Sequence, residues 1–183
     1  MKIAYVAHMK TRQESGILKK ILGQMLAWVE IGHEAKLFVL TPDSVWEGMR
    51  EVEMEIVRAQ TLATRLLEVS ELVHRTLMWG PDIVYLRHTV YYPSWRAMMR
   101  VTPTVVEINT NDVVERKHHP NSKIKNMYCN LTRDVLFRNA SGIVCVTKEL
   151  ADKFKRYGIP CVGIGNGIDL RDYAVKPAPQ NPE

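Results

Sequence analysis

The 183-residue sequence predicts an α/β protein, a three-layer sandwich in which helices cover both faces of a mainly parallel sheet. Short and almost wholly apolar runs recur along the chain, and such runs are typical of strands that are buried on both faces. Longer amphipathic segments separate these runs. This alternation is the pattern of parallel strands joined by helical crossovers, and it indicates a sheet of about six or seven strands.

The first unit is a strand followed by a helix that begins at a glycine. Lys2–Ala7 is a short apolar run and is expected to be a buried strand. The polar segment His8–Ser15 interrupts the pattern. From Gly16 onward the apolar residues fall on one face of a helix, and they are Ile17, Leu18, Ile21, Leu22, Met25, Leu26 and Val29. Gly32 follows where helices often end in a left-handed residue.

The start of this first helix is a candidate anion site. Its unpaired N–H groups point toward the preceding loop, and Gly16 would let a phosphate approach the backbone. Ser15 and Gly16 are therefore candidate phosphate-binding residues. The alternative is structural, with Ser15 acting only as an N-cap and Gly16 only loosening the first turn.

Strands and helices alternate over the rest of the chain. Further strands are expected at His33–Thr41, Val52–Val57, Asp82–Leu86, Thr104–Ile108, Gly142–Val146 and Cys161–Ile164. The run Val52–Val57 alternates apolar and acidic residues, which favours an edge strand with one wet face. Asp43–Met49, before it, is expected to be a surface loop.

Each expected helix has its own signal. The expected helices are Gln60–Trp79, a short helix begun at Pro93 within Tyr91–Arg100, Lys123–Asn139, and Lys148–Tyr157 capped by Thr147. The inner stripe expected for the first of these is Leu62, Leu66, Leu67, Val69, Leu72, Val73 and Leu77. Residues 1–170 are thus expected to form one domain, and residues 171–183, which end in KPAPQNPE, a linker.

Composition excludes several classes of protein. The chain is 46% hydrophobic and 25% charged, as soluble globular proteins are. No stretch approaches the roughly 20 apolar residues of a membrane helix, and the N-terminus is not a secretory signal. Cys129, Cys145 and Cys161 are too far apart for a CxxC metal site and give no disulfide framework, so a cytoplasmic location is expected. His118 and His119 with Cys129 lack a fourth ligand, so no metal site is expected.

The net charge of +5 and the pI near 9.1 permit acidic partners such as sugar nucleotides, anionic lipid headgroups or nucleic acid. Only Arg116–Lys125 is densely basic, and it lacks the interleaved aromatic residues that stack on single strands. A solvated loop is the favoured interpretation there, and no nucleic-acid partner is expected. The charge could also hold the protein peripherally at the cytoplasmic face of a membrane.

Four stretches carry a resemblance to a known family. They are LAWVEIGHEAKLFVLTP, PDIVYLRH, PTVVEINTND, and ASGIVCVTKELADKFKRYGIP followed by GNGID. In this order they resemble the N-terminal domain of the group-one retaining glycosyltransferases, which have two Rossmann-like domains in the B-type (GT-B) architecture. The resemblance covers about residues 1–170, and it departs from the family where Gly165 replaces the usual proline.

The resemblance implies transfer of a sugar from a nucleotide-sugar donor to a glycan, lipid or small-molecule acceptor, with retention at the anomeric carbon. In this family the N-terminal domain mainly shapes the acceptor side. The C-terminal domain grips the nucleotide and carries a pair of glutamates. The chain is therefore expected to be the acceptor-binding half of an enzyme, inactive by itself and missing its C-terminal domain, with no cofactor beyond the nucleotide-sugar substrate.

The resemblance also assigns site residues at the carboxyl ends of the strands, where ligands bind in such sheets. Gly16 matches the family's glycine that lets the loop approach the donor diphosphate, and Ser15 beside it is assigned to the same phosphate site. Asn109 falls where many members have a histidine near the transferred sugar; an asparagine can position a ligand but cannot take up a proton near neutral pH.

Four further residues are assigned to the acceptor side. Arg87 could meet a phosphate or an acidic acceptor bidentately or form a structural salt bridge. Glu107, on the same side of its strand as Asn109, could bind an acceptor hydroxyl or be a buried acid paired with Arg87. Asn111 and Asp112 could bind sugar hydroxyls, although both residue types also form ordinary turns.

Two other functions fit the same fold class. A stand-alone flavodoxin-like binding or signalling module is one, although a receiver domain should carry an acidic pair after its first strand and His8-Met9-Lys10 offers none. Half of a nucleotide-sugar epimerase of the same architecture is the other. The late helix and GNGID favour the transferase. The donor, the acceptor and the oligomeric state are not specified by these motifs.

Overall fold

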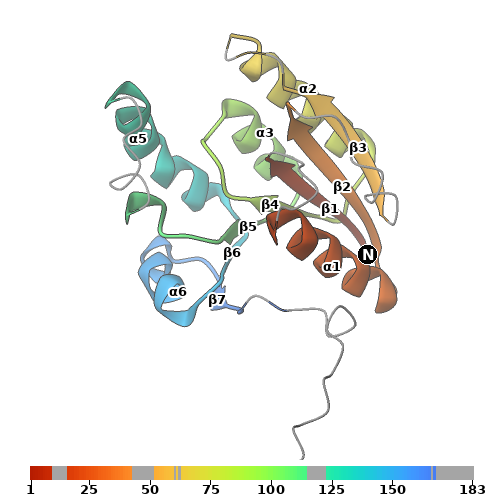
Figure 1. Ribbon diagram of the computed structural model, residues 1–183. Coiled ribbons are helices and arrows are strands. Elements are labelled where there is room, and N and C mark those ends of the chain that lie inside the picture. The colour runs from red at the N-terminus through yellow and green to blue at the C-terminus, as the bar shows by residue number, and fades with distance from the viewer. Residues whose placement is uncertain are drawn as a thin grey trace, which may run out of the picture.

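The computed structural model describes residues 1–9, 16–42, 52–59, 61, 63–114, 123–165 and 167. Its centre is a sheet of seven strands in the order β3-β2-β1-β4-β5-β6-β7 (Figure 1). The strands are β1 Lys2–His8, β2 Glu34–Thr41, β3 Glu53–Arg58, β4 Ile83–Arg87, β5 Thr104–Ile108, β6 Gly142–Cys145 and β7 Cys161–Gly163. Every pair of neighbours is parallel. The predicted fold class is confirmed.

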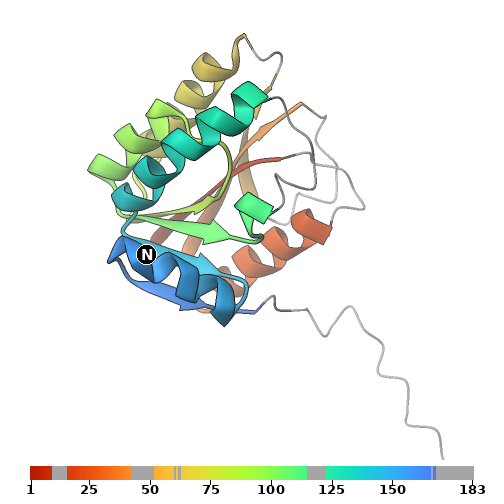
Figure 2. The same ribbon diagram turned by 90° about the vertical axis from the view of Figure 1, so that its left-hand side faces the viewer.

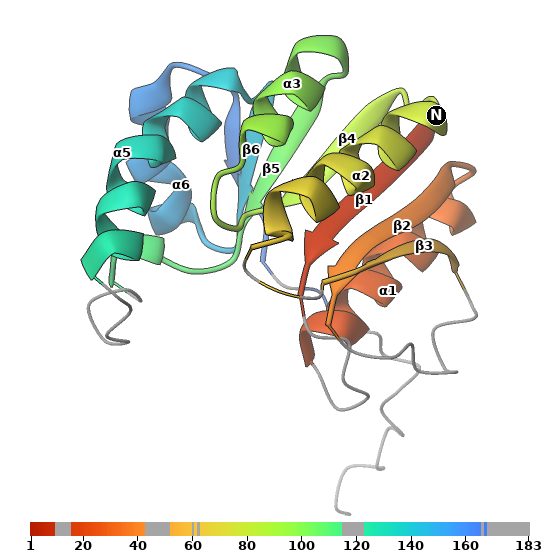
Figure 3. The same ribbon diagram turned by 90° about the horizontal axis from the view of Figure 1, so that it is seen from above.

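Helices lie on both faces of this sheet. They are α1 Gly16–Glu30, α2 Arg65–Met78, α3 Pro93–Val101, α5 Lys123–Asn139 and α6 Lys148–Phe154, which continues into the 3₁₀ turn Lys155–Tyr157. Helix α1 lies on one side of the sheet and α2, α3 and α5 lie on the other (Figures 2 and 3). Alternate residues of β1 serve the two cores: Tyr5 packs with α1, whereas Val6 belongs to the larger core on the opposite face.

The expected edge strand is present, since β3 lies at one end of the sheet order. Its acidic residues face the neighbouring strand's lysine: Lys36 Nζ lies 2.9 Å from Glu53 and 3.4 Å from Glu55. The solvent-facing side of β3, which its alternating sequence indicates, thus forms ion pairs with β2. The loop expected at Asp43–Met49 lies outside the described residues.

Several expected caps are confirmed. Gly32, two residues after the end of α1, has a φ of 89°, in the left-handed region. Pro93 opens α3. Thr147 caps α6, its side-chain oxygen accepting a hydrogen bond from the Leu150 N–H at 3.2 Å.

The expected apolar stripes of α1 and α2 were wrong at their ends. Ile17 and Val29 are 45% and 49% exposed, and Leu66 and Leu67 are 56% and 74% exposed. Ile17, Leu66 and Leu67 lie in first turns and Val29 in a last turn, where a helix has fewer neighbours. The buried stripe of α2 is Val69, Leu72, Val73 and Thr76. Leu62 lies outside the described residues.

Because all seven strands are parallel, their carboxyl ends meet at one edge of the sheet, and α1 begins at that edge. The register places Arg87 of β4 beside Glu107 of β5. Side chains from separate segments therefore converge here. Across the described part of the chain, no helix combines the length and the apolar character needed to cross a membrane.

Candidate functional site

A buried carboxylate, that of Glu107, lies at the centre of the carboxyl edge. Its side chain is only 2% exposed. The Tyr5 hydroxyl from β1 donates to Oε2 at 2.5 Å, and the Lys20 ammonium from α1 donates to Oε1 at 2.5 Å. Arg87 of β4 completes the set, with Nη1 3.4 Å from Oε2. The Glu107 carboxylate of β5 is therefore contacted by a hydroxyl from β1 and by two cationic side chains, one from α1 and one from β4.

This environment keeps Glu107 ionised. Burial alone would raise the pKa of the carboxyl, but the hydrogen bonds from Lys20 and Tyr5, with the charges of Lys20 and Arg87, hold that pKa below its usual value. The Tyr5 hydroxyl responds in the opposite sense: burial and the adjacent carboxylate raise its pKa far above the ordinary range. Tyr5 therefore stays protonated and remains a hydrogen-bond donor.

Lys20 also reaches Asn109, two residues beyond Glu107. Its ammonium donates to Oδ1 of Asn109 at 2.6 Å. Because an ammonium can only donate, the amide atom that faces it must be the oxygen, and the amide NH₂ must lie on the other branch. Asn109 is thus fixed in an orientation in which its NH₂ is turned away from Lys20 and can serve as a donor.

Lys20 was missed as a site residue in the sequence. A signal was available, since Lys20 lies four residues after Gly16 and four residues bring side chains to the same side of a helix. Its partners, however, are 87 and 89 residues away along the chain. Only the fold brings them together.

Arg87 lies at the end of β4, where it was expected, and it is paired with Glu107. The pair matches the structural alternative for both residues. The contact of 3.4 Å is long for a hydrogen bond, and the Arg87 side chain is 14% exposed. A guanidinium has five N–H donors, so the contact with Glu107 leaves it capacity to bind an anion as well.

Asp112 and Asn111 hold the loop after β5 in place. The Asp112 carboxylate is buried, and Arg133 of α5 grips it with Nε 2.9 Å from Oδ2 and Nη2 3.0 Å from Oδ1. Arg133 also donates to the Tyr157 hydroxyl at 2.7 Å. The side-chain oxygen of Asn111 accepts from the Val114 N–H at 3.3 Å and starts a helical turn. These contacts match the turn-forming alternative, and none of them points to an acceptor.

A second polar cluster joins β1 to α2 at the same edge. His8 ends β1, and its Nε2 lies 2.5 Å from Nη1 of Arg65. Arg65 in turn contacts Glu68, with Nε 3.2 Å from Oε2. Burial and then the charge of Arg65 lower the pKa of His8 to about 4. The ring is therefore neutral at physiological pH, and Nε2 accepts from the guanidinium. In the sequence, His8 was interpreted as the start of a polar segment at the carboxyl end of the first strand, and it was not assigned as a site residue.

Gly16 is the first residue of α1 and is exposed at the carboxyl edge. A Cβ built at this position would meet no atom within 4 Å. Packing therefore does not require a glycine here, and the space beside the helix start is open. Ser15, its companion in the expected phosphate site, lies outside the described residues.

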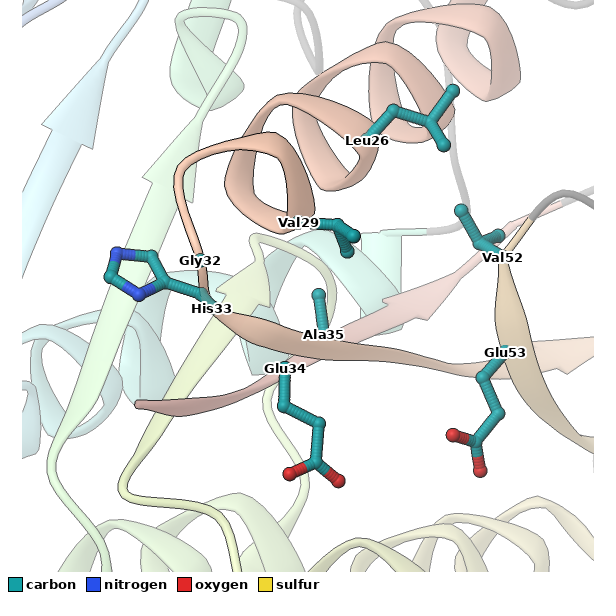
Figure 4. A pocket seen from close by; sticks show the side chains of 8 residues that line it. All are labelled: Leu26, Val29, Gly32, His33, Glu34, Ala35, Val52 and Glu53. Atoms are coloured by element: carbon teal, nitrogen blue, oxygen red, sulfur yellow. The ribbon is translucent and has the colours of Figure 1, made fainter.

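A pocket of about 560 Å³ lies elsewhere, between the end of α1 and the amino ends of β2 and β3 (Figure 4). Leu26, Val29 and Val52 contribute apolar side chains, whereas Glu34 and Glu53 point away from them. Lys2 and Lys36 are the partners of these two acids. The pocket is at the edge opposite the polar network, so we do not assign the site to it.

In the portion of the chain that is described, no cluster of three or more His, Cys, Asp or Glu residues could hold a metal ion. His118 and His119, which were considered as metal ligands from the sequence, lie outside that portion, and Cys129 is buried in α5. The carboxyl edge presents charged and hydrogen-bonding groups, among them Lys20, Arg87 and Asn109. It suits oxygen-rich and anionic ligands.

Comparison with known proteins adds a family. The model of the family described as Glycosyltransferase Family 4 matches residues 25–172. No curated protein matches the sequence.

Solved structures give the fold. One is the lipopolysaccharide outer core galactosyltransferase WaaB in its apo form, with a TM-score of 0.60 and 12% identity, over 100% of this chain and 50% of that one. Another is HepE from Anabaena in complex with UDP, with a TM-score of 0.59 and 16% identity, over 97% and 47%. A third is an alpha-glucosyltransferase in complex with UDP-glucose and DNA, with a TM-score of 0.55 and 16% identity, over 93% and 43%. The chain spans about half the length of each.

Proposed function

Because the chain belongs to Glycosyltransferase Family 4, we propose that it is the acceptor-side half of a retaining glycosyltransferase. The reaction would move a sugar from a nucleotide donor to a glycan, lipid or small-molecule acceptor. The two structures with ligands described above hold UDP or UDP-glucose, which supports a nucleoside diphosphate sugar as the donor of this chain.

The observation that carries the proposal is the network of Lys20, Glu107 and Asn109 beside the start of α1. A diphosphate leaving group gains negative charge as the glycosidic bond breaks, and N–H groups at a helix start together with a nearby cation stabilise that charge. Lys20 is one helical turn from Gly16, a rise of about 6 Å along the axis. The bound diphosphate would lie at Gly16, with Lys20 contributing positive charge.

Asn109 supplies a directed hydrogen-bond donor. Because its oxygen accepts from Lys20, its NH₂ is the group left for a substrate oxygen, such as a sugar hydroxyl. An amide does not take up a proton near neutral pH, so Asn109 positions the sugar and does not act as a base. Arg87 would bind an anionic group of the acceptor with the donors that Glu107 does not use.

Glu107, Asn111 and Asp112 have supporting parts in this proposal. Glu107 holds Lys20 and Arg87 in place. Asp112 binds Arg133 of α5 and so attaches to that helix the loop on which Asn109 lies. Direct acceptor contacts, which the resemblance implied for these residues, would compete with protein partners that already occupy the two carboxylates.

A second half would complete the enzyme. It would grip the nucleotide and supply further catalytic groups, so the chain alone should not turn over. The nucleotide sugar would be a substrate, and no metal or other cofactor is proposed. We place the protein in the cytoplasm.

The test compares the chain alone with the longer natural polypeptide that this proposal requires. UDP release from UDP-glucose and UDP-galactose, with water taking the sugar in place of the acceptor, is measured for each protein, with Asn109→Leu made in the longer one. We expect release only by the longer protein, and a strong loss with Asn109→Leu. Equal turnover by the chain alone would contradict the half-enzyme assignment, and normal turnover by Asn109→Leu would contradict the site.

A further inference from the structure

Two of the three cysteines meet where β6 and β7 lie side by side, at the end of the sheet that α6 covers (Figure 1). Cys145 lies in β6 and Cys161 in β7. The strands pair with Ile143 opposite Cys161 and with Cys145 opposite Gly163. Alternate residues of a strand point to the same face, and both cysteines pack in the larger core with Phe154 of α6. The fold thus brings together two thiols that are far apart in the sequence.

The two thiols contact each other. Cys145 and Cys161 are hydrogen-bonded to one another, and the Cys161 thiol also donates to the carbonyl oxygen of Ala151 at 3.3 Å. Because Cys161 uses its proton for Ala151, the proton between the two sulfurs is that of Cys145. Burial raises the pKa of both thiols, so the pair is neutral. Cys145 is fully buried and Cys161 is partly exposed, so a ligand would reach the pair from the Cys161 side.

The positions of the two cysteines favour a bridging atom over a direct bond between them. Neighbouring strands are about 4.8 Å apart and two residues rise about 6.6 Å, which separates the two Cα atoms by about 8 Å. A disulfide needs a Cα separation below about 7 Å. Strand β7 is held in its register by Gly163, where a Cβ would lie 2.7 Å from the backbone of Lys148. The two sulfurs therefore face each other without being placed to join.

A soft metal ion suits two sulfurs in this arrangement. Two metal–sulfur bonds of about 2.3 Å span about 4.6 Å, whereas a disulfide bond spans only about 2 Å. Zn²⁺ takes four ligands, but within the described residues no group of three or more His, Cys, Asp or Glu side chains could hold a metal ion. Thiolates select Cu(I) among the soft cations, and Cu(I) forms stable complexes with two sulfur ligands. The chemistry of the pair thus matches a soft monovalent ion.

We propose that Cys145 and Cys161 form a two-coordinate site for a soft monovalent metal ion such as Cu(I). Each thiol loses its proton as its metal–sulfur bond forms, so one bound ion releases two protons and no electron is transferred. The complex has one net negative charge, and the ammonium of Lys155 interacts electrostatically with Cys161. The ion takes no part in sugar transfer. It ties β7, an edge strand of three residues, to β6.

The test titrates the 183-residue chain with Cu(I) under argon, in competition with the chromogenic chelator bicinchoninate. Cys145→Ser and Cys161→Ser each remove one of the two sulfurs. Cys129→Ser is the matched control, because it removes the third thiol, which is buried in α5. Circular dichroism checks that each protein is folded, and Cys161→Ser changes a partly exposed side chain, so it disturbs the core least.

We expect the wild type and Cys129→Ser to take one Cu(I) from the chelator, and Cys145→Ser and Cys161→Ser to bind it about a hundredfold or more weakly. Bound Cu(I) should raise the melting temperature of the wild type but not that of Cys161→Ser. A wild type that takes no copper from the chelator, or equal binding by Cys129→Ser and Cys161→Ser, would overturn the proposal. A disulfide between Cys145 and Cys161, found by mass spectrometry of the folded protein after incubation in air, would also overturn it.

Discussion

The ammonium of Lys20 lies 2.6 Å from the side-chain oxygen of Asn109 and 2.5 Å from Glu107. The ammonium of Lys20 thus orients the Asn109 amide and is one of the groups that keep the buried Glu107 carboxylate ionised. Both partners are on β5, two residues apart, whereas Lys20 belongs to the helix that begins at Gly16. Any ligand at this edge of the sheet would meet these groups already fixed in place.

Replacing Lys20 with Met should destabilise the protein, because it leaves the Glu107 carboxylate buried without its closest cation. We expect a loss of about 2–4 kcal/mol in the free energy of unfolding near neutral pH. The deficit should shrink as the pH falls, because Glu107, which then keeps only Tyr5 and Arg87 as partners, takes up a proton more readily in the folded state. Urea unfolding at several pH values measures both effects.

Lys19→Met is the matched control, since Lys19 is the neighbouring lysine and is exposed. It should change the free energy of unfolding by less than about 0.5 kcal/mol. Equal effects of the two substitutions would show that Lys20 does not support Glu107.

His8 predicts a dependence of stability on pH. Its pKa is lowered from 6.5 to about 4 in the folded protein. Between these values the unfolded chain binds a proton at His8 that the folded chain does not, so the free energy of unfolding falls as the pH drops from about 6.5 toward 4. We expect this residue to account for about 3 kcal/mol of the fall.

Two measurements check this prediction. The His8 ring proton resonances should titrate near pH 4 in NMR spectra. His8→Gln should lose less stability than the wild type between neutral pH and pH 4, whereas His74→Gln, on the exposed side of α2, should follow the wild type. A His8 midpoint at its ordinary value would contradict the buried contact with Arg65.

The sequence predicted the fold because its signals are local. The bounds of Thr104–Ile108 and Lys123–Asn139 were predicted as the structure has them, since an apolar run and a helical period are properties of adjacent residues. The end of β1 and the start of α1 were also placed within one residue. The polar edge of the sheet follows from these elements alone.

The partners at that edge could not be predicted in the same way. Glu107 and Asp112 were interpreted as ligand contacts or as structural residues, and the choice depends on Lys20 and Arg133, which are 87 and 21 residues away. The exposure of Leu66 and Leu67 likewise depends on which part of α2 meets the sheet. The spacing of residues shows which of them lie on the same side of a helix, but not what packs against that side.

The pair Asp112 and Arg133 should couple strongly. Their side chains are 8% and 12% exposed, and the guanidinium grips the carboxylate through two nitrogens. A double-mutant cycle with Asp112→Asn and Arg133→Gln should give a coupling free energy of about 2 kcal/mol. The exposed pair Asp152 and Lys155 of α6, at 2.5 Å, is the control and should show no measurable coupling. Similar coupling in both pairs would contradict the role of burial.

Gly163 of β7 should be intolerant of any side chain. A Cβ there would lie 2.7 Å from the Cα and N of Lys148 and 2.8 Å from the carbonyl carbon of Thr147. These are backbone atoms at the capped start of α6, so a side chain could be accommodated only by moving the helix from β7. We expect Gly163→Ala to lower the free energy of unfolding by about 2 kcal/mol.

Gly165→Ala gives the comparison within the same segment, because a Cβ at Gly165 would meet nothing within 4 Å. It should leave the urea midpoint near that of the wild type. Equal stability of the two variants would mean that α6 can shift without cost. A large loss confined to Gly163→Ala would instead show that contact between β7 and the start of α6 fixes this corner of the carboxyl edge.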